Sequence, residues 1–163
     1  MNKVEDITFH YTNEDMVKEL LNIVPYQFDD VLLDPSAGVN KVFYNNFKCD
    51  KKMFCEIDLG IDFYSFNEEV DWIITNPPFH ESWKFIQHTL PLCRKGFAYL
   101  FNVNAWNSLT PLRLQKISEY GFNLSKVHIV MDSRWFGRYY FCIFEKKENN
   151  FLTWNTKSYS KNN

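Results

Sequence analysis

The sequence predicts an α/β fold, in which buried strands end in ligand-binding turns and alternate with helices. Two observations predict this class. Short apolar runs at 31–33 and 72–75 are rich in β-branched or bulky residues and are typical of buried strands. Each run passes directly into a polar turn, D-P-S-A-G at 34–38 and N-P-P-F at 76–79. Because open α/β sheets bind ligands at the carboxyl ends of their strands, these turns predict the site.

Composition limits the class of protein. The 163 residues are 45% hydrophobic and 18% aromatic, enough for one domain with a substantial core. No apolar run approaches the length of a membrane span, and the first residues, M-N-K-V-E-D, lack the apolar stretch of a signal peptide. We therefore expect a cytoplasmic protein. The four cysteines and four histidines form no metal-like spacing, so we expect no metal site.

Charge is divided unevenly along the chain. Residues 1–71 contain 6 Lys or Arg and 15 Asp or Glu, whereas residues 72–163 contain 12 and 5. This division suggests two faces with different partners, the second attractive to phosphates. Scattered, solvated charge would explain the same counts.

The first third of the chain predicts a helix, two strands and two acidic ligands. Thr12 or Asn13 is a candidate N-cap for a helix that ends before Pro25. After the strand at 53–55, Glu56 is placed to accept hydrogen bonds from ribose hydroxyls, although a solvated strand end is the alternative. Asp62 could accept from an adenine amino group, with the Phe63 ring beside it. Too few residues separate the two carboxylates for a helix, so the fold is expected to be trimmed there.

The N-P-P-F turn predicts a binding site for a flat ring that carries an amino group. Pro77 and Pro78 stiffen the end of the strand, while Asn76 offers an amide and Phe79 an aromatic face. A plain strand-ending turn is the alternative. His80 follows directly and could act as a base, or it could pack in the loop or contact phosphate.

The remaining chain predicts a helix around 83–90, a strand at 96–103 and a helix at about 111–120. Two strands at 126–131 and 139–145 are joined by a short turn and predict a hairpin. We expect residues 1–145 to form a single domain and residues 146–163 a polar tail, with no separate target-recognition domain.

In this order and spacing, H-Y-T-N, D-P-S-A-G, E-I-D, D-F and N-P-P-F resemble the motifs of class I S-adenosylmethionine (SAM)-dependent amino-methyltransferases, most of all small phage-type DNA adenine-N6 methyltransferases. The resemblance covers roughly residues 9–145. It implies a Rossmann-like, mostly parallel seven-stranded sheet with a C-terminal reversed β-hairpin. One departure is Asn40, which stands where the family usually has a second glycine; Asn tolerates left-handed backbone angles.

The resemblance also implies roles for individual residues. Asn76 and the Pro77 carbonyl would accept from the target amine, stabilising the charge that develops on nitrogen, while Phe79 would stack on the base. The catalytic motif comprises Asn76, Pro77, Pro78 and Phe79. Cofactor-binding candidates are Tyr11, Thr12, Asp34, Pro35, Ser36, Ala37, Gly38, Glu56, Ile57, Asp62, Phe63 and Asn76. Nucleic-acid candidates are Phe79, His80, Trp106, Arg113, Arg134, Trp135 and Arg138.

Three functions stay open at this point. The first is methylation of adenine N6 in DNA, with low sequence specificity or a helper subunit. The second is methylation of an RNA base at adenine N6 or guanine N2, because N-P-P-F-H also resembles the motif of ribosomal guanine-N2 enzymes. The third is a catalytically degenerate partner subunit that keeps the fold, for which Asn40 is the hint.

Overall fold

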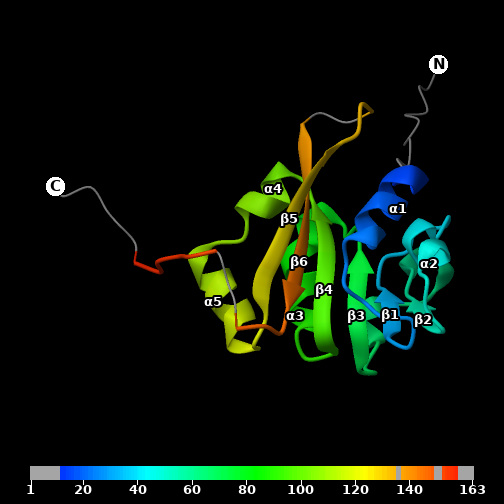
Figure 1. Cartoon of the computed structure of the whole chain (residues 1–163), viewed down its shortest axis with the longest axis horizontal. Coiled ribbons are helices and arrows are strands. Elements are labelled where there is room, and N and C mark those ends of the chain that lie inside the picture. Colours follow the sequence, from blue (N-terminus) through cyan, green and yellow to red (C-terminus); the bar gives the residue numbers. More distant parts are fainter. Residues whose placement is uncertain (1–11, 135–136, 149–151, 158–163) are drawn as a thin grey trace, which may run out of the picture.

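A computed structural model describes residues 12–134, 137–148 and 152–157. These residues contain one six-stranded sheet in the order β2-β1-β3-β4-β6-β5 (Figure 1). The strands are β1 (Val31–Asp34), β2 (Lys51–Phe54), β3 (Val70–Thr75), β4 (Cys93–Phe101), β5 (Asn123–Met131) and β6 (Arg138–Glu145).

The sheet is mixed, and the expected seventh strand is absent from the described residues. β1 pairs in parallel with both β2 and β3, and β3 with β4, whereas β6 runs antiparallel to both β4 and β5. The reversed hairpin is therefore confirmed and the seven-stranded sheet is wrong. The seventh strand is missing from the residues described because the segment between β2 and β3 is short: it forms only two 3-10 turns, Ile57–Leu59 and Phe63–Ser65. A strand and its crossover helix need more residues than this segment has.

Helices cover both faces of the sheet and bury two apolar clusters. α1 (Glu14–Asn22) and α2 (Val42–Asn46) pack on one face. α3 (Ser82–Thr89), α4 (Val103–Asn107) and α5 (Pro111–Glu119) contribute to the cluster on the other. None of the helices in the described part of the chain is long and apolar enough to cross a membrane.

Capping residues fix where helices begin. The Asn13 side chain accepts from the Met16 amide and starts α1, as the sequence predicts. The strand expected at 96–103 instead ends at Phe101, because the Asn102 side chain accepts from the Ala105 amide at 2.8 Å and starts α4. Thr110 caps α5 in the same way, ahead of a proline at the first helical position.

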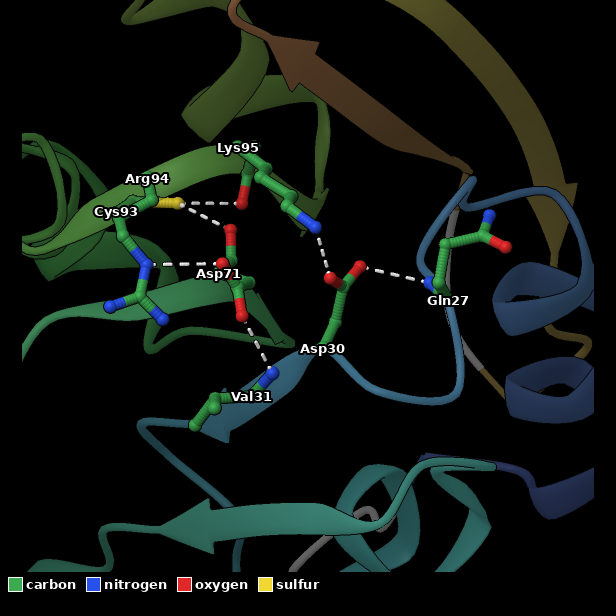
Figure 2. Close-up of polar contacts among 8 residues, drawn as sticks. Gln27, Asp30, Val31, Asp71, Cys93, Arg94 and Lys95 are labelled. Atoms are coloured by element: carbon green, nitrogen blue, oxygen red, sulfur yellow. Dashed lines mark hydrogen bonds and ion pairs between the residues drawn. The ribbon is translucent and has the colours of Figure 1, made fainter.

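Ion pairs tie together the amino ends of the three central strands (Figure 2). Asp71 accepts from the Val31 amide at 2.9 Å and from the Arg94 guanidinium at 3.0 Å. Next to it, Asp30 pairs with Lys95. These contacts lie at the amino ends of β1, β3 and β4, so they stabilise the sheet at the end opposite the predicted site.

Candidate functional site

A cavity of about 770 Å³ opens at the carboxyl ends of β1 and β3, beside the segment that follows β2. It is lined by residues from the H-Y-T-N, D-P-S-A-G, E-I-D and D-F motifs and from the N-P-P-F turn. The predicted site residues among its lining are Thr12, Pro35, Ser36, Ala37, Gly38, Glu56, Ile57, Asp62, Phe63, Asn76, Pro77, Pro78 and Phe79. Tyr11 and Trp135 lie outside the described residues.

The loop after β1 is held against the loop after β2 by main-chain hydrogen bonds. The Ala37 amide donates to the Cys55 carbonyl at 3.0 Å, and the Gly38 amide donates to the Glu56 carboxylate at 2.6 Å. Gly38 has a φ of 66°, which glycine adopts without steric cost. The second residue of this loop with left-handed backbone angles is Lys41, at φ 50°. Asn40, which replaces the family's second glycine, does not adopt them.

Glu56 and Asp62 are each held by the 3-10 turn that follows. Glu56 is only 8% exposed and accepts from the Asp58 amide at 3.2 Å, while Asp62 accepts from the Tyr64 amide at 3.0 Å. A bridge between Glu56 and Ile61 closes the loop between them. The trimmed segment therefore still brings both predicted carboxylates to one cavity.

Asp34 lies behind the cavity and is not part of its lining. Its side chain is buried, accepting from the Thr75 hydroxyl at 2.7 Å, and its Oδ2 has no hydrogen-bond partner among the described residues. Burial away from water, assisted by the negative charge of Glu56, raises the pKa of Asp34 to about 7. Asp34 is therefore a cofactor-binding candidate that is not among the residues lining the cavity.

Asn76 presents an amide with one end engaged and one end unused. Its Nδ2 donates to the Thr12 hydroxyl at 3.0 Å, and its main-chain carbonyl accepts from the Ser36 hydroxyl at 3.1 Å. The side-chain Oδ1 is buried and accepts no hydrogen bond from any described residue. A buried acceptor without a donor is costly, so it requires an explanation, and a bound ligand that donates to it is one.

Several lining residues were not predicted, because distant elements bring them in. Tyr139 of β6 lies with its ring centroid 6.0 Å from that of Phe79. Tyr64 donates from its hydroxyl to Glu81 at 3.1 Å, which links the segment after β2 to the turn after β3. The unpredicted lining residues are Met16, Val39, Val42, Phe43, Asp58, Tyr64, Glu81, Phe85, Leu100, Asp132 and Tyr139. Val39, Asp58, Tyr64 and Glu81 lie within or beside the motifs, so their positions in the sequence could have indicated them.

The described nucleic-acid candidates other than Phe79 lie outside the lining. Trp106 stacks on Tyr140, with centroids 5.4 Å apart, and the Arg113 guanidinium lies 5.0 Å from the Trp83 ring centroid. Arg134 is paired with Asp132, a lining residue. His80 and Arg138 are exposed.

The charge of the described lining is entirely negative. It includes carboxylates but no Lys or Arg. The carboxylates belong to Glu56, Asp58, Asp62, Glu81 and Asp132. Such a site favours a cationic ligand and disfavours one that places phosphates inside.

Comparisons with known proteins give the fold. No family model and no curated protein matches the sequence. The structure resembles TrmN from Thermus thermophilus with a TM-score of 0.60 and 18% identity, over 83% of this chain and 49% of TrmN, so the chain spans about half of that protein. It resembles PH1948, a putative RNA methyltransferase from Pyrococcus horikoshii, with a TM-score of 0.62 and 18% identity over 84% of this chain and 87% of that one.

A third similar structure contains a ligand. Magnesium protoporphyrin IX methyltransferase from Synechocystis PCC 6803, with bound SAM, gives a TM-score of 0.60 and 13% identity over 82% of this chain and 78% of that one. Other similar structures include the 23S rRNA methyltransferase ErmE and a tRNA m1G37 methyltransferase from M. jannaschii. The chain therefore has the α/β fold of the class I SAM-dependent methyltransferases.

Proposed function

We propose that this chain is a SAM-dependent methyltransferase that methylates the exocyclic amino group of a nucleic-acid base. The observation that carries the proposal is the buried Oδ1 of Asn76, which has no hydrogen-bond partner among the described residues. Asn76 lines the cavity immediately before two prolines and Phe79. An exocyclic amine is the donor that this acceptor lacks. The amide and the Phe79 ring together suit a planar, amino-bearing base.

The same cavity suits SAM. Glu56 and Asp62 are the candidates for the ribose hydroxyls and the adenine amino group, and Ile57 and Phe63 supply apolar surface beside them. A lining of carboxylates is compatible with the positive sulfonium and ammonium of SAM, whereas it would repel the diphosphate of a dinucleotide. The similar structure with bound SAM supports the same ligand.

SAM supplies a methyl group on a positively charged sulfur, and this chain's residues prepare the acceptor. Hydrogen bonds from the amine to Asn76 Oδ1 and to the Pro77 carbonyl would favour a pyramidal nitrogen and stabilise its developing positive charge. Stacking on Phe79 would offset part of the cost of unstacking the base, at roughly 1–3 kcal/mol per base. No basic side chain is needed to remove a proton before transfer. The methylated nitrogen would release its proton to water after transfer, so His80 has no required role.

Two polynucleotides are candidate acceptors. RNA is supported by the similar structures described as a putative RNA methyltransferase and as a 23S rRNA methyltransferase. DNA adenine N6 is supported only by the motif resemblance of D-P-S-A-G and N-P-P-F. RNA is therefore the first acceptor to test, and a helper or specificity subunit is the first addition if the chain alone is inactive.

The test is methyl transfer from labelled SAM to single- and double-stranded DNA and RNA, followed by mass spectrometry of the nucleosides. We expect an N-methylated base, and a loss of about a hundredfold or more in kcat for Asn76→Ala. Asn107→Ala, at an exposed residue outside the cavity, is the matched control and should keep full activity. Undiminished transfer by Asn76→Ala would refute the mechanism, and SAM binding in calorimetry without any transfer would favour the degenerate partner subunit.

A further inference from the structure

We infer that Thr12 is a positioning residue that fixes the orientation of the Asn76 amide for methyl transfer. The inference rests on the proposed function and adds to it a role for the Thr12 hydroxyl that differs from cofactor contact. Its basis is a single hydrogen bond between residues far apart in the chain, from Asn76 Nδ2 to Thr12 Oγ1 at 3.0 Å.

This bond decides which end of the amide remains for a ligand. A primary amide offers a donor nitrogen and an acceptor oxygen, and only the oxygen can accept from a target amine. In the structure the nitrogen donates to Thr12, and the oxygen is the end that has no partner among the residues described. If the amide rotated by half a turn, its NH2 group would take that place and would repel an amine.

Thr12 is itself held in place by its neighbour. Asn13 accepts from the Met16 amide at 3.1 Å and caps α1, so Thr12 immediately precedes the capping residue of a helix. α1 is anchored by Val17 and Leu20, both fully buried on the sheet. The hydroxyl is therefore presented to Asn76 from a packed element.

The main chain of Asn76 is fixed independently of Thr12. Its carbonyl accepts from Ser36 Oγ at 3.1 Å, and Ser36 Oγ also lies 2.7 Å from Thr75 Oγ1. Thr75 in turn donates to Asp34. Removal of the Thr12 hydroxyl would thus leave the backbone in place and release only rotation of the side-chain amide.

Two substitutions test the role. Thr12→Val keeps the shape of the side chain and removes the hydroxyl, whereas Thr12→Ser keeps the hydroxyl. We expect Thr12→Val to lower kcat at saturating SAM by about ten- to a hundredfold, as misplacement of a reacting group does. We expect the Kd for SAM in calorimetry to change less than about twofold, since the contact is with Asn76. Thr12→Ser should recover most of kcat.

The possible outcomes are separable. An unchanged kcat in Thr12→Val would overturn the inference, and so would a raised Kd for SAM with kcat intact, because that pattern belongs to a cofactor contact. Failure of the wild-type chain to methylate any nucleic acid would instead count against the proposed function.

A measurement without turnover decides the inference in either case. The side-chain amide of Asn76 gives two proton resonances in a ¹⁵N spectrum, assignable by their loss in Asn76→Ala. In Thr12→Val their exchange with water should quicken by about tenfold, because a protecting hydrogen bond is gone. Resonances that neither shift nor exchange faster would show that Thr12 does not hold the amide.

Discussion

Substitution of Asp34 by Asn should remove the pH dependence of stability that comes from the buried Asp34 carboxyl. The carboxyl is 1% exposed, and desolvation is the main reason that its pKa is raised from 3.8 to about 7. Because the folded protein holds the proton more tightly than the unfolded chain, the stabilisation is complete below pH 3.8 and is lost as the pH rises through about 7. Asn retains the oxygen that accepts from Thr75 and carries no charge.

The size of the effect follows from the two pKa values. The gap between them corresponds to on the order of 4 kcal/mol, lost at about 1.4 kcal/mol per pH unit between roughly pH 4 and pH 7. This is a large part of the 5–15 kcal/mol that holds a typical domain folded. The quantity to follow is the difference in unfolding free energy between Asp34→Asn and the wild type, because groups common to both cancel.

Urea unfolding at several pH values between 4.5 and 8 measures that difference. It should grow in favour of Asp34→Asn as the pH rises and then level off above about pH 7.5. Asp15→Asn, at an exposed position on α1, is the matched control and should parallel the wild type. If the curves for Asp34→Asn and the wild type are also parallel, the buried carboxyl does not titrate as the structure implies.

Three further substitutions test other parts of the structure. Asp71→Asn should lower the unfolding free energy by about 1–2 kcal/mol at pH 7 in urea titrations. Burial alone would raise the pKa of Asp71, but hydrogen bonds and nearby cations outweigh it and lower the pKa. The stability that the carboxylate contributes is therefore lost when acid protonates it. Asp71→Asn should accordingly lose less stability than the wild type below about pH 4. Gly96→Ala should cost about 1–3 kcal/mol, seen as a lower melting temperature, since the new Cβ would lie 2.5 Å from the Trp72 ring; an unchanged melting temperature would refute this close packing. Tyr139→Leu should raise KM for the proposed polynucleotide acceptor by about three- to tenfold, because the ring that packs against Phe79 is lost. Tyr139→Phe keeps a ring and should raise KM less. Equal KM values for the two variants would exclude ring packing as the cause.

Motifs predicted the parts of the site that lie close together in the chain. The turns after β1 and β3 are encoded where the strands end, so the lining by Pro35, Gly38 and Asn76 follows from local sequence. Tyr139 reaches the cavity only because β6 pairs antiparallel with β4, and no local pattern carries that register. Asp34 shows what a motif position does not encode, since packing buries its side chain outside the lining of the cavity.

The missing strand also explains how a short chain keeps both carboxylates at one cavity. In a longer sheet a crossover would separate Glu56 from Asp62, whereas here the Glu56–Ile61 bridge folds the segment back on itself. Each carboxylate then caps a 3-10 turn and accepts from a main-chain amide two residues later, and Glu56 also accepts from the Gly38 amide. The position of these side chains therefore depends on hydrogen bonds within the loops. The sheet can lose a strand without disturbing these bonds. What the loss does change is the sheet edge, where β2 has no neighbour beyond β1 among the described residues. Lys51 is exposed on β2, and a charged side chain on an edge strand disfavours pairing with a further strand. A sheet that ends at β2 needs this protection.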